Sequence, residues 1–536
     1  MKTKILESKY ILKVLSFLTL CFLIYSRHKI SYDDLIQLST TVNYLNGYGF
    51  CLKFYDGEYI IHEAVNSWPM LYRIIAVPFV FFTNNVEISS ILIKIFTYLF
   101  LYLTLYYYFS SLFKNKKEIN IALNICFCFI TVSIAPFNYG GVTDILSVCF
   151  ILLCCLFAYK YFFVKSLPKY LFLFFLCITI TLNLRYAYLP TVLLVLFCFF
   201  LLEIKFKTFK KNLFLKIVLL GFFVLNVILI VSNDYFLSST ESLLDSIVEN
   251  KTIWSYYYSV FFSPLFPDYI ILNAVSKFLS SSNTVYFLFY SMVVIFSFVS
   301  GYVVFSFFYK RFVKIKIGDV FLESSLVFCV LVNLISLFVP FGVFGTYSEK
   351  NLTNISYFTN ALLATQDRYE LLAFVAFFIL FTYYSLITDK KIFQYLLISS
   401  FIFNLSHFIY LNTRYNLSRY ENMKIASLPE GSYNDCLNIN DLLIKEQNHN
   451  ILFIENYKLN SELEKRQINP GKYVVSAGLT LFINYTKTRK AIKRERFNKN
   501  TFDKIVYCDL TKNSNLYLEK YNCTYSGYIY SLFEQK

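Results

Sequence analysis

The sequence lacks the short motifs that identify several common classes of enzyme. No glycine-rich phosphate-binding loop, no zinc-ligand spacing and no Gly-x-Ser-x-Gly motif occur in its 536 residues. ATP-driven pumping and serine hydrolysis therefore lose support. The chain also lacks an internal repeat and a low-complexity linker. Residues 1–25 have a basic start and an apolar core, but no small-residue cleavage site follows, so we expect a retained signal anchor.

Long apolar runs dominate the rest of the chain. Hydrophobic residues make up 57% and aromatic residues 21%, and the mean hydropathy is +0.52, well above the usual apolar share of soluble domains. The runs are continuous rather than alternating, which favours spanning helices over a barrel. We expect an all-α polytopic membrane fold of about eleven spans, each of roughly 20 residues. They are placed at 11–26, 88–110, 119–136, 143–163, 169–183, 187–202, 213–232, 286–309, 320–340, 371–388 and 393–411.

The basic residues set the expected topology. The net charge is +16, but Lys and Arg cluster between apolar runs, which the positive-inside rule explains better than a nucleic-acid partner. A cytoplasmic N-terminus places on the inside Lys114, Lys116, Lys117, Lys160, Lys165, Lys169, Lys205, Lys207, Lys210, Lys211, Lys310, Arg311, Lys314, Lys316, Lys390 and Lys391. We therefore expect a multi-pass protein of a bacterial plasma membrane.

The extramembrane parts are expected on the outer face. Residues 1–413 form the membrane domain, whose first outer loop, 27–87, holds two membrane-lying helices; the second, 68–82, is too short to span and carries Arg73. Residues 414–536 are polar and mixed, typical of a small extracytoplasmic α/β domain. Its expected strands are 451–454, 473–476, 504–508 and 525–532. The extramembrane cysteines, which could form disulfides, are Cys51, Cys436, Cys508 and Cys523.

Three carboxylates lie at expected outer ends of spans. Asp33 and Asp34 precede a short amphipathic helix, 35–46, that closes on a Gly-Tyr-Gly-Phe sequence. One acid there suffices as a helix N-cap, which leaves the other for a cation, a substrate or general base catalysis. Asp144 stands at the mouth of the fourth span. It either caps that helix or converges on Asp33 to hold a divalent cation or an acceptor hydroxyl.

Two arginines and one loop cluster complete the candidate residues. Arg185 and Arg368 lie at outer ends of spans, where a guanidinium group either binds a lipid phosphate or extends towards headgroups. Glu58, His62 and Glu63 gather in the first outer loop. They could supply ligands to a divalent metal, although their spacing is not specific.

The acidic first loop resembles that of a known superfamily. Residues 33–50 read DDLIQLSTTVNYLNGYGF, which is similar to the first outer loop of integral-membrane GT-C glycosyltransferases of the aminoarabinose transferase and protein O-mannosyltransferase type. That family usually has Glu where this chain has Asp34. Further likenesses follow in the same order: WPMLY at 68–72, Thr143-Asp144, the basic-aromatic turn at 184–190, and Arg368-Tyr369.

This resemblance implies a reaction and a set of roles. A sugar would move from a polyprenyl-phosphate donor to a glycolipid, cell-surface glycan or protein acceptor on the outer face, with inversion. Asp33, beside Asp34, would be the general base, and Asp144 would orient the acceptor or a divalent metal cofactor. Arg185 and Arg368, with Tyr369, would hold the leaving phosphate, whose growing charge they stabilise.

Two rival functions make different demands on the sequence. A lipid-linked sugar transporter predicts ionisable residues at mid-membrane and often internal repeats, whereas the acids here gather at outer ends. A lipid-linked glycan polymerase or ligase centres on a large late loop and lacks an acidic first loop and a soluble tail. Both demands favour the glycosyltransferase.

Overall fold

The computed structural model separates the chain into two compact units. One comprises Met1–Ser26 and Ile95–Leu411, and the other comprises Arg27–Lys94 and Asn412–Lys536. The residues that the structure describes are 32–45, 47–56, 59–64, 69–83, 86–134, 142–208, 210–232, 299, 301–336, 371–388, 391–396, 398–399, 451–455, 491–496, 504–508, 521–526 and 530–535.

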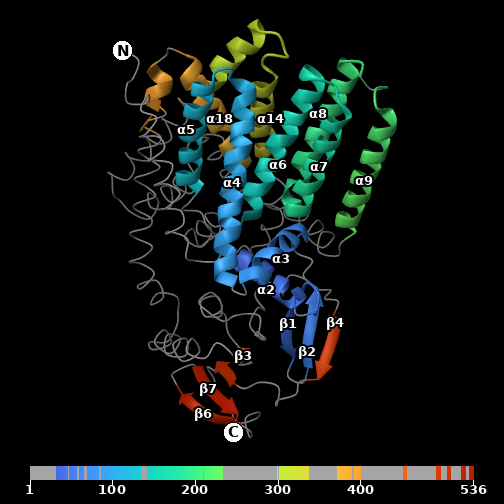
Figure 1. The fold of residues 1–536 in the computed structure, drawn as a ribbon, viewed down its shortest axis with the longest axis vertical. Helices are drawn as coiled ribbons and strands as arrows, with labels where there is room; N and C mark the ends of the chain where they lie inside the picture. Colours follow the sequence, from blue (N-terminus) through green and yellow to red (C-terminus); the bar gives the residue numbers. More distant parts are fainter. Residues whose placement is uncertain are drawn as a thin grey trace, which may run out of the picture. The chain divides into compact units, whose positions relative to one another are not determined.

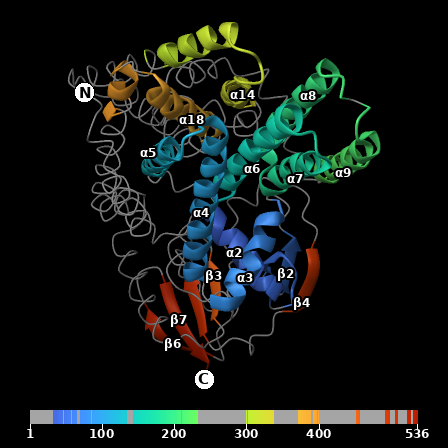
Figure 2. The same cartoon turned by 45° about the horizontal axis from the view of Figure 1, so that its top comes forward.

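The first unit is a bundle of helices. In the bundle α6 packs against α7, α7 against α9, and α14 against α18; α6 to α9 lie side by side in both views (Figures 1 and 2). A π-helical turn, Lys160–Val164, extends α6, and residues 301–314 are also helical. The helices are α4 (Val86–Leu112, which starts in the other unit), α5 (Lys116–Ile134), α6 (Val142–Tyr159), α7 (Pro168–Leu184), α8 (Leu189–Lys205), α9 (Leu213–Val231), α14 (Phe321–Ser336) and α18 (Leu371–Ile387).

Several of these helices are long and apolar, which indicates a multi-pass membrane protein. In the described part of the chain, three are long enough to span a bilayer by length and composition: Ile88–Leu112, Val142–Val164 and Leu213–Ile230. Shorter apolar helices include Pro168–Leu184 and Leu371–Ile387. Helices therefore occur at most of the predicted spans, but 11–26 lies outside the described residues, so the total of eleven stays a prediction.

Aromatic rings and thiols fill the interior of the bundle. Phe199 of α8 stacks on Phe174 of α7 with ring centroids 4.2 Å apart. Cys154 and Cys155 of α6 are buried free thiols, which confirms that cysteines of the apolar runs act as small hydrophobic residues. Cys51, in the other unit, is also a free thiol and so takes no part in a disulfide here.

In the residues that the structure describes, the second unit contains α2, α3, the first turns of α4 and two small sheets. Strands β1, β2 and β4 form an antiparallel sheet in that order, so β4, from near the C-terminus, pairs with the early strand β2 (Figure 1). The other sheet has the order β3-β5-β7-β6, with β3 and β5 parallel. The elements are α2 (Tyr32–Leu45), β1 (Cys51–Asp56), β2 (Tyr59–Ala64), α3 (Leu71–Thr83), β3 (Ile451–Glu455), β4 (Ala491–Arg496), β5 (Lys504–Cys508), β6 (Tyr521–Ser526) and β7 (Tyr530–Gln535).

A glycine turn connects α2 to the first strand. Gly47 has φ +81°, and its N–H donates to the carbonyl of Tyr44 while Tyr48 N–H donates to that of Asn43. This double hydrogen bond is a Schellman motif, which needs a left-handed residue after the helix. The Asn43 side chain also donates to the Cys51 carbonyl at 2.8 Å. The predicted helix and its glycine ending are confirmed, with the helix starting earlier, at Tyr32.

One expectation for the second unit is incomplete and another is wrong. The first outer loop holds not only helices α2 and α3 but also the β1–β2 hairpin, in which Asp56 lies opposite Tyr59. Gly57 directly follows Asp56 in the sequence, and glycine at the first position of a two-residue connection favours such a hairpin. The single strand predicted at 525–532 is instead divided between β6 and β7, which form an antiparallel pair, because Gly527 lies between them and favours a turn. Run 473–476 lies outside the described residues.

Candidate functional site

A buried ion pair joins two residues that the sequence singled out separately. Arg185 Nε lies 2.9 Å from Asp144 Oδ1, and the two side chains are 9% and 3% exposed. Asp144 belongs to the first turn of α6, and Arg185 directly follows α7. The sequence placed both residues at outer ends of spans, but it did not predict that they contact each other.

Local backbone structure explains why the pair forms at this place. Arg185 has extended backbone angles (φ −155°, ψ 111°), so the chain leaves α7 there. A 3₁₀ turn, Tyr186–Tyr188, follows, and α8 starts at Leu189 with proline in its first turn. The carboxylate at the N-terminus of α6 and the guanidinium at the C-terminus of α7 each complement the dipole of their helix.

The pair lies at the lysine-poor ends of its helices. Lys160 and Lys165 flank the far end of α6, and Lys169 stands in the first turn of α7. A helix of 23 residues, the length of α6 and its π-helical extension, is about 35 Å long at roughly 1.5 Å per residue. The acid–arginine pair and the lysine clusters are therefore at opposite ends of the same helices.

A buried, oriented guanidinium has a defined chemical use. The contact with Asp144 holds Arg185 in one geometry and balances its charge. Arginine presents several N–H donors in a planar fork that fits phosphate or carboxylate oxygens. Donors that are fixed before substrate binds stabilise developing negative charge without reorganisation. The arrangement can thus hold an anionic leaving group.

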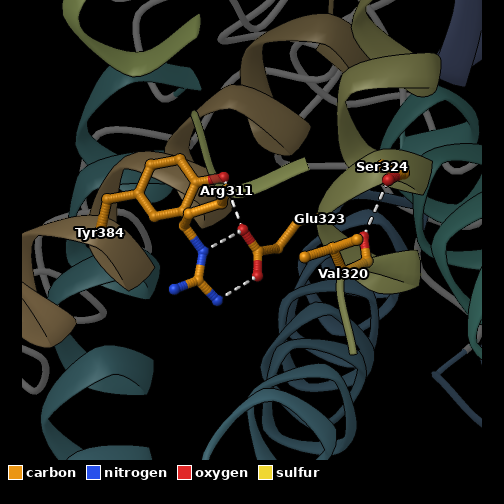
Figure 3. Close-up of polar contacts among 5 residues, drawn as sticks. All are labelled: Arg311, Val320, Glu323, Ser324 and Tyr384. Carbon is orange, nitrogen blue, oxygen red and sulfur yellow. Dashed lines mark hydrogen bonds and ion pairs between the residues drawn. The ribbon is translucent and has the colours of Figure 1, made fainter. Parts of the chain in front are cut away.

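A second polar cluster joins three helical segments of the first unit (Figure 3). Arg311 donates to both carboxylate oxygens of Glu323, from Nε at 3.0 Å and from Nη2 at 2.8 Å. The Tyr384 hydroxyl donates to Glu323 Oε2 at 2.7 Å. Burial lowers the pKa of Arg311, but the hydrogen bonds and charge of Glu323 outweigh it and the net pKa is raised. Glu323 of α14 therefore connects α14 to the helical segment 301–314 and to α18 through hydrogen bonds.

A third cluster joins α8 to α9. Lys216 Nζ lies 2.6 Å from Glu203 Oε2 and also donates to the carbonyl of Thr208 at 2.9 Å. The Thr208 hydroxyl donates to the same carboxylate oxygen at 3.0 Å. Sequence reasoning missed both this cluster and the one at Glu323. The sequence does hold a signal for both clusters: Glu203 and Glu323 each stand at the end of an apolar run, next to a basic loop. A buried carboxylate at such a place requires a cationic partner.

The acidic pair of the first loop lies at the start of α2. Asp33 and Asp34 are the second and third residues of that helix, so they occupy its first turn, where carboxylates complement the helix dipole. Their side chains lie outside the described set, and their catalytic roles stay predictions. Arg368 and Tyr369 also lie outside the described residues.

Two of the proposed metal ligands, His62 and Glu63, are consecutive residues of β2. His62 pairs with Lys53 on β1 and with Lys493 on β4, and Glu63 pairs with Leu52. Among the side chains that the structure describes, no group of three or more His, Cys, Asp or Glu residues could hold a metal ion. The side chains of His62 and Glu63 are outside that set, as is Glu58 altogether, so a metal here stays a prediction.

No family model, curated protein or solved structure matches this chain. The likeness to the GT-C superfamily therefore stays a resemblance based on the motifs quoted above. The structural support for a function comes from the Asp144–Arg185 pair and from its place in the bundle.

Proposed function

We propose that this protein is an integral-membrane glycosyltransferase. It transfers a sugar, with inversion, from a polyprenyl-phosphate donor to an acceptor on the outer face of the membrane. The observation that carries the proposal is the buried pair of Asp144 and Arg185 at the lysine-poor end of the bundle. A fixed cation can bind a lipid-linked phosphate, and the resemblance gives Arg185 this role.

The proposed chemistry assigns each group one task. Asp33 takes the proton of the acceptor hydroxyl, and the acceptor oxygen attacks the anomeric carbon of the sugar. The bond between that carbon and the phosphate oxygen breaks, and the polyprenyl phosphate leaves with the electron pair. Arg185 stabilises the charge that grows on the leaving phosphate. Arg368 and Tyr369 assist it, and Asp144 orients Arg185 or the acceptor.

Mass spectrometry of surface glycans tests this function. Glycolipids and glycoproteins are compared between cells with the intact protein, a deletion, Asp33→Asn and Arg185→Lys at equal expression. We expect the deletion and Asp33→Asn to lose the same sugar mass. Arg185→Lys keeps the charge but loses the planar fork, so we expect it to lower the amount of that product.

The exposed Asp319 offers a matched control. Asp319→Asn makes the same chemical change at an exposed position in the turn before α14 and should leave the glycan profile unchanged. If the deletion loses a glycan that Asp33→Asn retains, Asp33 has only a structural role. A lipid-linked glycan transporter or polymerase then becomes the better explanation.

A further inference from the structure

Two buried threonine hydroxyls in the first unit differ from those threonines that donate to their own helix. Thr104, Thr131 and Thr181 donate to the carbonyl four residues earlier, at 2.9, 2.7 and 2.9 Å. Thr143 and Thr191 are 2% and 0% exposed. Within the part of the chain that the structure describes, their Oγ1 atoms have no hydrogen-bond partner.

Helix geometry explains this difference. Thr143 and Thr191 lie in the first turns of α6 and α8, where a residue has no helical carbonyl four positions earlier to accept its hydroxyl. Tyr188, which precedes α8, makes no side-chain cap. Buried polar groups are normally hydrogen-bonded. A bound group that accepts hydrogen bonds would satisfy both hydroxyls.

Both threonines belong to the elements that meet at the ion pair. Thr143 directly precedes Asp144, and Thr191 follows Arg185 across the 3₁₀ turn, Tyr186–Tyr188. The contact between Asp144 and Arg185 joins the first turn of α6 to this α7–α8 connection. The two hydroxyls therefore belong to the first turn of α6 and to the start of α8, and the ion pair joins α6 to the turn that leads into α8.

We propose that Thr143 and Thr191 donate hydrogen bonds to the phosphate oxygens of the lipid-linked donor. This inference rests on the proposed function and adds two binding residues to it. Helix N-termini favour anions through their unpaired N–H groups and their dipoles, and the two hydroxyls and the Arg185 guanidinium can all donate hydrogen bonds to an anion. A phosphate supplies several acceptor oxygens, whereas a neutral sugar hydroxyl lacks the charge that this environment favours.

Binding of a polyprenyl monophosphate to the full-length protein in nanodiscs tests the proposal. The variants are Thr191→Val, Thr143→Val and Thr191→Ser. Loss of one hydrogen bond to a charged group should weaken binding about tenfold. We expect Thr191→Val and Thr143→Val to show this loss and Thr191→Ser, which keeps the hydroxyl, to bind like the unchanged protein. In turnover assays the valine variants should raise the donor KM more than they lower kcat.

Thr131→Val is the matched control, since Thr131 is equally buried and donates to its own helix. It should leave binding unchanged. The polyprenol without phosphate should bind equally to all variants, and competition by inorganic phosphate would separate a free-phosphate site from a lipid-phosphate site. If Arg185→Ala weakens binding while both valine variants do not, this inference is wrong and the proposed function stands. If the unchanged protein does not bind the lipid phosphate, both fail.

Discussion

At the scale of single residues, the buried Asp144–Arg185 ion pair is costly to form. Removing two charges from water costs several kcal/mol per ion in practice, and only close geometry and further hydrogen bonds offset that cost. A pair of this kind adds little stability compared with apolar residues of similar size. Its formation in the bundle therefore favours a role beyond stability, such as holding a guanidinium where an anion binds.

Neutralising one partner should destabilise the protein more than neutralising both. In Asp144→Asn or Arg185→Gln, a buried charge is left without its 2.9 Å partner, so each should lower the free energy of unfolding by about 3 kcal/mol. The decrease in the free energy of unfolding should be clearly smaller for the double variant than the sum of the decreases for the two single variants. Thermal unfolding in detergent measures the cycle, and the exposed Asp319→Asn should change stability by less than about 0.5 kcal/mol. Additive losses would contradict energetic coupling between the two groups.

At the scale of elements, the turn from α2 to β1 determines how the acidic helix ends. Gly47 and Gly49 have φ of +81° and +79°. The Tyr44 and Phe50 rings, on either side of the turn, stack with centroids 4.3 Å apart and 4° between their planes. Left-handed backbone is costly for residues with a β-carbon. The turn therefore depends on glycine, and the sequence could predict it because that dependence is local.

Gly47→Ala should destabilise the second unit through backbone conformation alone. A β-carbon at Gly47 meets nothing within 4 Å, so the expected cost of about 1 kcal/mol comes from the left-handed φ. Gly47→Asn should cost less, because asparagine tolerates this region. A β-carbon at Gly221 of α9 also meets nothing within 4 Å, but there the backbone is a right-handed helix. Gly221→Ala should therefore leave the stability of the protein unchanged or raise it. Hydrogen exchange of α2 and β1 measures the effect; equal results for Gly47→Ala and Gly221→Ala would contradict it.

Local signals also decide which other elements the sequence could predict. Apolar runs such as those of α4 and α9 determine a helix directly, and β5 has the predicted bounds, Lys504–Cys508. The β1–β2 hairpin had a local signal, Asp56-Gly57, which competed with the expectation of a membrane-lying loop. The contact of Asp144 with Arg185 had no local signal in the sequence. The expected membrane topology predicts at which end of a helix each residue lies, but it does not predict which helices are neighbours. Pairing of β2 with β4 depends on residues far apart in the sequence and could not be predicted.

At the scale of the whole molecule, the C-terminal segment is not a separate attachment. Arg27–Lys94 and Asn412–Lys536 form one compact unit, and β4 extends the hairpin of the first outer loop. The hairpin is in turn tied to α2 by the hydrogen bond from the Asn43 side chain to the Cys51 carbonyl. Through β4 and the hairpin, the tail is therefore connected to α2, the helix that carries Asp33 and Asp34.

A proline in β4 should weaken the first-loop hairpin, whereas a proline in β6 should not. Arg494 lies opposite Ile61 of β2, and Asn522 lies opposite Glu534 of β7; both β4 and β6 are edge strands of their sheets. Proline removes a backbone donor and distorts a paired strand. Hydrogen–deuterium exchange of the full chain should show that Arg494→Pro speeds exchange in β2 and Asn522→Pro speeds it only in β7. If Arg494→Pro leaves β2 protected, the hairpin folds without the tail, and removal of residues 491–536 should leave α2 in place. If β2 loses protection, the acidic helix and the tail fold together, and truncation of the tail should abolish sugar transfer even though Asp33 is intact.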